Sequence, residues 1–308
     1  MRKPLNARLV TFLAGAALLL PTTVACAQDA APAESPAGEP PAAQSPAGEP
    51  PAAEGGGRAQ PTLNIIGLTD DNKLVEFSSE RPTPRETGTI SGLSGGDTRL
   101  IGLDFRAKDG QLYGVGDQGG LYTVATNGQA TSVGRLTIPL QGTNFGVDFN
   151  PAADALRVVS DTGQNLRQPM AATPLAATVA DTQLSAPPAA PPLNGITGAA
   201  YTNNDADPNT ATTLYDLDAA TDQIVIQSPA NSGQTAATGK LTVDAGPVAG
   251  FDIYSIASGG AITDQVGYGV LEVNDQYGLY RITLFSGKAE LVGDLGRGVV
   301  DLAIPLNQ

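Results

Sequence analysis

The chain has 308 residues, contains no histidine or tryptophan, and carries a formal net charge of −14. Without histidine, Ser-His-Asp and Cys-His catalysis, imidazole metal sites and histidine acid/base chemistry are excluded. The acidic balance favours solubility, opposes binding to nucleic acid or anionic lipid, and is compatible with cations, glycans and protein partners.

The N-terminus has the pattern of an export signal. Residues 1–8 are basic, and residues 9–20 form an apolar stretch that is too short to span a bilayer. The sequence therefore predicts a signal peptide over residues 1–25 and an extracytoplasmic location for the rest of the chain.

The end of this signal contains Cys26, the single cysteine of the chain. The run 23–26 resembles the lipobox of bacterial lipoproteins, although Thr23 stands where that family usually has leucine. The resemblance implies acylation of Cys26 and attachment to the cell membrane through this lipid alone. Residues 25–27 also fit the ordinary signal peptidase, so a secreted or periplasmic protein is the alternative. A single cysteine excludes an internal disulfide.

Residues 26–60 are rich in proline, alanine and glutamate. The segment 35–43 recurs as 45–53, and neither copy has large apolar side chains to bury. Burial therefore cannot offset the entropy lost on ordering, and we predict a disordered tether.

Residues 61–308 are predicted to form one all-β domain. Short alternating strands are separated by turn residues, and one short strand recurs five times. The third position of each copy is Asp104, Asp148, Ala200, Asp252 or Asp301. Spacings of this length are typical of four-stranded propeller blades.

Hairpins with polar turns follow the first four copies, at residues 112–124, 156–167, 214–227 and 267–282. The fifth copy ends the chain, and the missing hairpin lies at residues 63–77. We therefore predict a five-bladed β-propeller in which the C-terminal strand completes the N-terminal blade. A six-bladed ring is the alternative if the proline-rich residues 173–192 contain further strands.

Four segments of this domain are similar to a known family: residues 100–124, 145–167, 199–203 and 213–216. They resemble the bacterial domain-of-unknown-function 4394 family over about residues 63–306, and 145–167 is the most specific run. The resemblance implies an exported, propeller-like protein and implies no reaction.

The repeated aspartates, Asp104, Asp148, Asp252 and Asp301, are one candidate for chemistry. If their strands are innermost, four carboxylates approach the axis, and such oxygen ligands suit calcium. Alternatively, each aspartate accepts backbone N–H bonds and joins neighbouring blades. Regular recurrence favours this structural role, because functional sites usually break a repeat.

The copy that contains Asp148 does break the repeat. It carries polar residues where the other copies have Tyr, Val or Ile: Arg157, Asp161, Gln164, Asn165 and Arg167. Arginine suits carboxylate or phosphate groups, and the other side chains suit sugars or peptide backbone. We predict a ligand-binding site here, with an Arg–Asp network that locks a turn as the alternative.

A weaker calcium-loop pattern occurs at Asp205, Asp207 and Asn209, which alternate as calcium ligands do. Pro208 interrupts the pattern, and Thr210 replaces the usual glycine. A solvated loop between strands is the alternative.

Two classes of function fit these features. The first is a non-enzymatic module that binds a protein or glycan outside the cytoplasmic membrane. The second is an extracytoplasmic hydrolase or lyase that uses carboxylates, with or without calcium as its cofactor. The missing histidine and nucleophile motifs favour binding, whereas the fold alone decides nothing. Perturbed carboxylates in a cleft with Arg157 and Arg167 would favour the enzyme.

Overall fold

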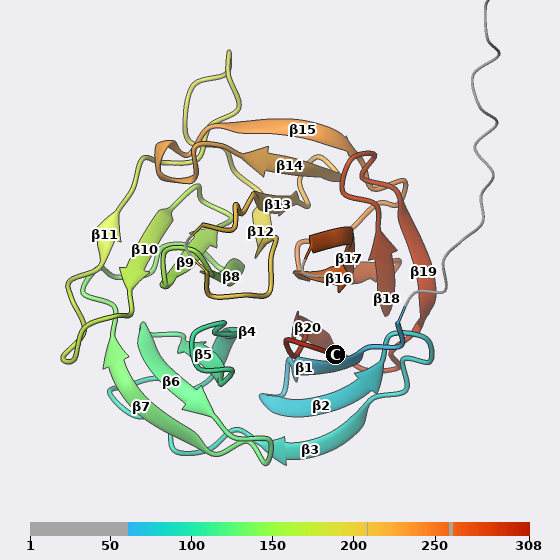
Figure 1. The fold of residues 1–308 in the computed structure, drawn as a ribbon. Coiled ribbons are helices and arrows are strands. Elements are labelled where there is room, and N and C mark those ends of the chain that lie inside the picture. The colour runs from blue at the N-terminus through green and yellow to red at the C-terminus, as the bar shows by residue number, and fades with distance from the viewer. Residues whose placement is uncertain (1–60, 208, 259–260) are drawn as a thin grey trace, which may run out of the picture. The chain divides into compact units, whose positions relative to one another are not determined.

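The computed structural model describes residues 61–207, 209–258 and 261–308. These residues form five antiparallel sheets of four strands each, which surround a central axis as the blades of a propeller (Figure 1). The predicted all-β, five-bladed architecture is confirmed.

Each blade is built from four strands, ordered from the axis outward. Blade 1 contains β20 (Val299–Ala303), β1 (Asn64–Thr69), β2 (Lys73–Ser78) and β3 (Arg85–Thr89). Blade 2 contains β4 (Leu100–Phe105), β5 (Leu112–Gly116), β6 (Gly120–Val124) and β7 (Ala130–Arg135). Blade 3 contains β8 (Phe145–Asn150), β9 (Ala155–Ser160), β10 (Asn165–Pro169) and β11 (Val179–Ala180). Blade 4 contains β12 (Ile196–Tyr201), β13 (Leu214–Asp218), β14 (Gln223–Gln227) and β15 (Thr235–Lys240). Blade 5 contains β16 (Ala249–Ser258), β17 (Ala261–Val273), β18 (Gln276–Ile282) and β19 (Ala289–Asp294).

The C-terminal strand closes the ring. β20 pairs antiparallel with β1 and lies beside it near the axis (Figure 1). The register places Gly67 opposite Leu302 and Leu68 opposite Asp301. The predicted closure is therefore confirmed, and it leaves neither end of the ring with an unpaired inner strand.

The glycine that precedes the repeated aspartate marks the closest approach between inner strands. A Cβ atom added at Gly146 would lie 2.5 Å from the backbone nitrogen of Ala199, in the next blade. At Gly198 it would lie 2.9 Å from the Cβ atom of Phe251. Glycine is required where backbones meet this closely, which explains why it recurs.

Apolar side chains fill the spaces between blades. Among the described residues there are five hydrophobic clusters, one at each junction of neighbouring blades. Side chains that alternate along each strand point to the two faces of its blade, and both faces are buried against the neighbouring blades. The hydrophobic core is therefore divided into five clusters arranged around the ring.

The proline-rich residues 173–192 do not form a sixth blade, so that alternative was wrong. They contribute only the two-residue strand β11 at the outer edge of blade 3. The one helix of the described chain is a 3-10 turn, Ala230–Ser232, and no described helix is long and apolar enough to cross a membrane.

Candidate functional site

The central pocket lies where the five inner strands begin. Its volume is about 240 Å³, and every blade contributes to its wall. The polar residues that define it are Asp70 and Asn72 from blade 1, Arg99 from blade 2, Asn144 from blade 3, Thr197 from blade 4 and Tyr277 from blade 5. Apolar side chains between these groups give the mixed lining that is typical of ligand sites.

Irregular strand pairing shapes this pocket. Leu100 pairs with Gly116 and Gly102 with Val115, so Ile101 between them has no partner across the strands. The same shift leaves Thr197 unpaired in β12 and Val300 unpaired in β20. A β-bulge re-aims the side chain of the extra residue, and all three of these residues line the pocket.

Thr197 is the polar exception at its position in the five copies of the repeat. Ile101, Phe145, Ala249 and Gly298 occupy the same place in the other copies of the repeat. The Thr197 side chain is 1% exposed, and its hydroxyl has no hydrogen-bond partner among the described residues. A buried hydroxyl without a partner is costly, so this group is suited to bonding a molecule within the pocket.

Arg99 supplies a cation at the rim. Its carbonyl oxygen accepts a hydrogen bond from the Asp117 amide at 3.0 Å, which fixes the backbone where β4 begins. The side chain is exposed, and within the described part of the chain its guanidinium makes no hydrogen bond or ion pair. The five N–H donors of this side chain are therefore not used by hydrogen bonds within the described residues, although its charge acts on the nearby Asp117 carboxylate.

Asp161 and Gln164, two of the predicted site residues, support the loop that leads into the pocket. The Asp161 carboxylate accepts hydrogen bonds from the Thr143 amide at 3.0 Å and the Asn144 amide at 3.1 Å. The Gln164 side chain accepts from the Gln141 amide and donates to the Pro139 carbonyl, both at 2.9 Å. These hydrogen bonds hold residues 139–144 in place, and the last two of these residues line the pocket.

The other three predicted residues meet at the junction of blades 3 and 4, away from the pocket. Arg157 donates to Asp181 and Asn165, both at 2.7 Å, and to Asn231 at 2.8 Å. Arg167, opposite Arg157 in the strand register, donates to the same Asp181 carboxylate at 3.0 Å. This is the geometry of the alternative Arg–Asp network, and a ligand-binding role for these residues stays a prediction.

The sequence did not single out Asp181, which joins the two arginines, because it lies in the aperiodic, proline-rich segment. Asp216 faces the same junction and is completely buried, and neither of its carboxylate oxygens has a partner in the described chain. Burial raises the pKa of Asp216 to about 8, against the opposing effect of the Arg157 charge. Asp216 replaces the glycine found at Gly114 and Gly269 in other blades.

The repeated aspartates tie four of the five pairs of neighbouring blades together. The Asp301 carboxylate accepts from the Leu103 amide at 2.7 Å, Asp104 from Phe149 at 2.7 Å, Asp148 from Tyr201 at 3.0 Å and Asp252 from Ile304 at 2.7 Å. The chain of ties is interrupted between blades 4 and 5, where Ala200 has no carboxylate to offer. These four hydrogen bonds are those expected from the structural role that the sequence favours for the repeated aspartates.

Three of these carboxylates could also hold a cation. Asp104, Asp148 and Asp252 each offer an oxygen within 4.8 Å of the others, and all three are buried. Burial raises their pKa values well above the ordinary range, and it raises that of Asp252 to about 7. The nearby negative charges raise those of Asp104 and Asp148 further. Protons shared among the three carboxyl groups would neutralise their negative charge, as a bound cation would.

The predicted calcium loop is held by its own hydrogen bonds. An oxygen of Asp205 accepts from the Asp207 amide at 2.8 Å, and an oxygen of Asp207 accepts from the Asn209 amide at 2.9 Å. Both aspartates and Asn209 are exposed. These contacts are those of a solvated loop, and calcium binding there stays a prediction.

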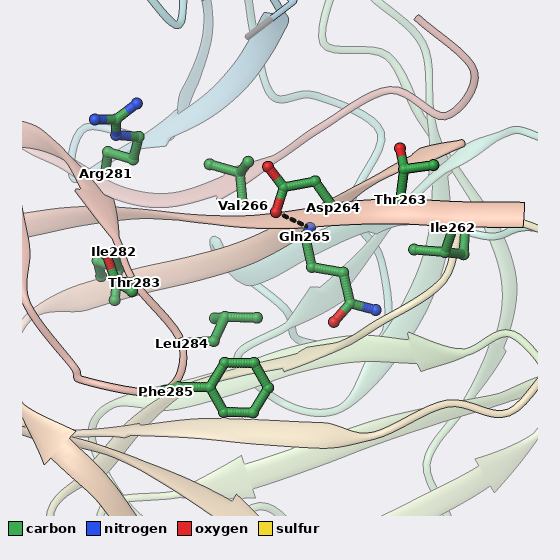
Figure 2. A pocket seen from close by; sticks show the side chains of 10 residues that line it. All are labelled: Ile262, Thr263, Asp264, Gln265, Val266, Arg281, Ile282, Thr283, Leu284 and Phe285. Carbon is green, nitrogen blue, oxygen red and sulfur yellow. Dashed lines mark hydrogen bonds between the residues drawn. The ribbon is translucent and has the colours of Figure 1, made fainter. Parts of the chain in front are cut away.

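Two other cavities lack the features of the central pocket. One, of about 570 Å³, lies along β17 and the turn that follows β18, where Leu284 and Phe285 lie below Gln265 (Figure 2). One blade forms all of it, and Phe285 is 77% exposed. The other, of about 550 Å³, is a largely apolar groove at the edges of blades 1 and 2.

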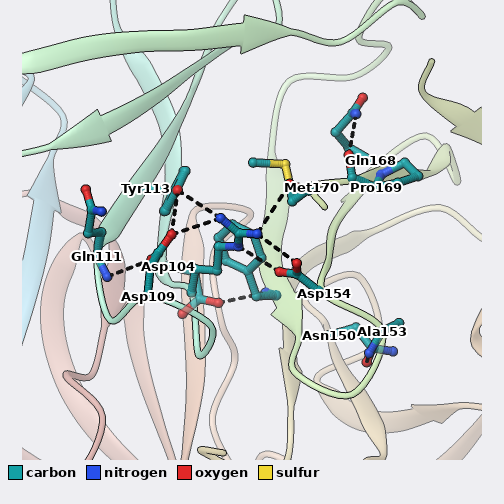
Figure 3. Close-up of polar contacts among 12 residues, drawn as sticks. Asp104, Asp109, Gln111, Tyr113, Asn150, Ala153, Asp154, Gln168, Pro169 and Met170 are labelled. Atoms are coloured by element: carbon teal, nitrogen blue, oxygen red, sulfur yellow. Dashed lines mark hydrogen bonds and ion pairs between the residues drawn. The ribbon is translucent and has the colours of Figure 1, made fainter. Parts of the chain in front are cut away.

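The opposite ends of the inner strands carry a closed charge cluster. The Arg106 guanidinium donates two hydrogen bonds to Asp154 in blade 3, both at 2.7 Å, and one to Asp109 at 2.8 Å. The Tyr113 hydroxyl donates to Asp109 at 2.9 Å, and Figure 3 shows Tyr113 and Asp109 on one side of this cluster and Asp154 on the other. The charged groups of this cluster pair with one another, and the pair of Arg106 with Asp154 links blade 2 to blade 3.

Comparison with known protein families gives a match over most of the chain. The family described as "Domain of unknown function (DUF4394)" matches residues 73–303. Cys26 and the rest of residues 1–60 lie outside the described residues. No curated protein sequence matches the chain.

The solved structures to which the chain is similar include three distant matches. A chain of a nidogen/laminin complex is 14% identical, with a TM-score of 0.44, 80% of this chain covered and 100% of that chain. A protein from Lactobacillus plantarum is 14% identical, with a TM-score of 0.42, 79% of this chain covered and 99% of that one. An auxiliary nutrient binding protein from Bacteroides thetaiotaomicron is 16% identical, with a TM-score of 0.35 and coverages of 56% and 46%.

Proposed function

This chain belongs to the Domain of unknown function (DUF4394) family, and from that premise we propose that its propeller is a non-enzymatic binding module whose ligand occupies the central pocket. The observation that carries the proposal is the buried Thr197 hydroxyl, which lines the pocket without a partner in the described chain. Arg99 lines the same pocket and its guanidinium makes no hydrogen bond or ion pair within the described residues, which also supports the proposal.

The competing proposal, a hydrolase or lyase that uses carboxylates, has less support. The carboxylates with raised pKa values are buried and accept backbone hydrogen bonds between blades. Asp216 lies near the charge of Arg157, but the two side chains are only 0% and 2% exposed. Neither side chain lines the central pocket, so neither is placed to act on a ligand bound there.

The proposal also places the module outside the cytoplasmic membrane, anchored by a lipid on Cys26, where it would bind a protein or glycan. The pattern of residues 1–60 supports this placement. Metabolic labelling with a fatty acid would test it in the producing cell. Label on the wild-type chain and none on Cys26→Ser supports the anchor, and label on neither chain overturns it.

The binding role is tested by filling the pocket. Thr143 is exposed at the rim and its hydroxyl makes no hydrogen bond in the described chain, so Thr143→Trp should block the pocket without unfolding the blade. Thr62→Trp, at another exposed position, is the matched control. The melting temperature of the whole chain would be followed with envelope sugars, short peptides, calcium and EDTA, because a ligand of the native state raises it.

A ligand that stabilises the wild type and Thr62→Trp but not Thr143→Trp supports the proposal. If each stabilising ligand acts equally on all three proteins, or if no ligand acts on any, the central pocket is not a binding site.

A further inference from the structure

The polar groups of the central pocket that are left free are mainly hydrogen-bond donors. Asn72 uses its side-chain oxygen to accept from the Leu100 amide at 3.1 Å, which leaves its NH₂ group free. The Arg99 guanidinium and the hydroxyls of Thr143 and Thr197 likewise donate to no acceptor within the described residues. These donors come from blades 1 to 4, with Arg99 and Asn72 on adjoining blades.

The free acceptors are fewer. Asn144 donates its NH₂ group to Asp161 at 3.2 Å, so its side-chain oxygen faces no donor in the described chain. The Asp70 carboxylate is exposed and likewise makes no hydrogen bond or ion pair with a described side chain. Asp70 also lies close enough to Tyr277 for its charge to contribute, after burial and Glu272, to the raised pKa of that tyrosine. The negative group of the pocket is therefore Asp70 in blade 1, and its positive group is Arg99 in blade 2, whose charge also acts on the neighbouring Asp117 carboxylate.

We infer that the ligand is a small hydroxylated carboxylate of the sugar-acid type, an inference that rests on the proposed binding role of the pocket. Its carboxylate bonds the Arg99 guanidinium, whose planar fork matches two carboxylate oxygens, with the NH₂ group of Asn72 beside it. Its hydroxyls donate to the Asp70 carboxylate and to the Asn144 oxygen, and one of them can donate to or accept from the Thr197 hydroxyl.

The size and the walls of the pocket fit one sugar ring. A volume of about 240 Å³ lies just below the range of about 300–1,000 Å³ that is typical of pockets for drug-sized ligands, which suits a ligand of about one ring. Phe145 and Tyr277 are half-buried and give aromatic surfaces on two sides. A free sugar acid and the terminal acidic residue of a glycan offer the same chemistry to this pocket.

The test compares ligands that differ only in the carboxylate. Titration calorimetry on the whole chain would use glucuronate, galacturonate, glucose and galactose, and a disaccharide that ends in glucuronic acid. We expect at least one acid to bind tenfold or more tightly than its neutral counterpart. Binding of the disaccharide as tightly as the free acid assigns the site to a glycan end, and loss of binding assigns it to the free acid.

Arg99→Gln removes the charge but keeps an amide, and Arg81→Gln is the matched control at an exposed arginine outside the pocket. Arg99→Gln should weaken binding of the acid at least tenfold and leave binding of the neutral sugar unchanged. Arg81→Gln should change neither, and melting curves should show that both variants fold.

Equal binding of acid and neutral sugar, or equal affinity of Arg99→Gln and wild type for the acid, overturns the carboxylate inference. If neither sugar class binds but another molecule stabilises the wild type and not Thr143→Trp, the binding role stands and this inference falls. If no molecule is sensitive to Thr143→Trp, both fall.

Discussion

At the scale of single residues, the polar groups of this chain fall into those that the scaffold uses and those that it leaves free. Arg157 is 2% exposed, and each of its terminal nitrogens bonds a side-chain oxygen. Arg99 is exposed and bonds none in the described chain. The side chain best equipped to bind an anion is therefore held inside the junction of blades 3 and 4, and the free one stands at the pocket.

Removing Arg157 should destabilise the fold strongly. Arg157→Ala leaves Asp181 and two side-chain amides without their buried donor, and breaking a buried ion pair in this way costs about 3–5 kcal/mol. Arg167→Ala should cost about 1 kcal/mol, because Arg167 is 29% exposed and water replaces it. Urea unfolding of both variants measures the difference. Equal, small losses would return Arg157 to the list of ligand-binding candidates.

The buried carboxyl group of Asp216 should make the stability of the folded protein depend on pH. Its pKa is about 8 in the folded protein and about 4 in an unfolded chain, so the folded state holds a proton that the unfolded state releases between these values. The stability that this proton provides is complete below pH 4 and is lost as the pH rises through 8. The loss should be on the order of a few kcal/mol.

The check is urea unfolding of wild type and Asp216→Asn at pH 5.5 and pH 9. The amide imitates the protonated carboxyl, so the variant should lose less stability on going to pH 9. The buried aspartates at the axis act in the same direction in both proteins, and the difference between the two isolates Asp216. Identical losses would show that Asp216 is ionised throughout this range.

At the scale of elements, the inner strands are joined by their aspartates. Asp301 in the closing strand holds the Leu103 amide of blade 2. Asp301→Asn keeps an oxygen for this amide, whereas Asp301→Ala leaves a buried N–H unpaired at a cost of about 1–3 kcal/mol. We expect the alanine variant to be less stable than the asparagine variant by that amount in urea unfolding at pH 7. Equal stability would mean that the tie contributes nothing to the scaffold.

The strands and their order could be predicted because each blade repeats the same local pattern. The recurring Gly-x-Asp strand is a direct consequence of packing at the axis, where Gly146 has no room for a Cβ atom. The same repeat predicted that β20 would complete the blade that begins with β1. β11 could not be predicted, because two residues in an aperiodic segment carry no alternation.

The candidate site was less predictable for a physical reason. The pocket depends on β-bulges at Ile101, Thr197 and Val300, and a bulge is set by the register with the neighbouring strand. One signal was present in the sequence, since Thr197 is polar where the other copies are not. Following that exception would have led to the pocket, whereas Arg157, Asn165 and Arg167 led to a buried junction.

At the scale of the whole molecule, the ring depends on a pairing between its two ends. Truncation after Leu295 removes β20, and with it four buried residues that fill the cores on both sides of blade 1: Val299, Leu302, Ala303 and Ile304. It exposes the edge of β1 and removes the ties made by Asp301 and Ile304. The truncated chain should therefore lose cooperative unfolding and aggregate, as measured by calorimetry and light scattering.

Removal of residues 306–308 alone is the control, because it keeps β20 and costs only the terminal contacts of Gln308 with Asn64 and Tyr254. That shorter deletion should lower the melting temperature by only a few degrees. A cooperative transition in the longer truncation would show that four blades and the three remaining strands of blade 1 suffice, and that the central pocket can exist without closure of the ring.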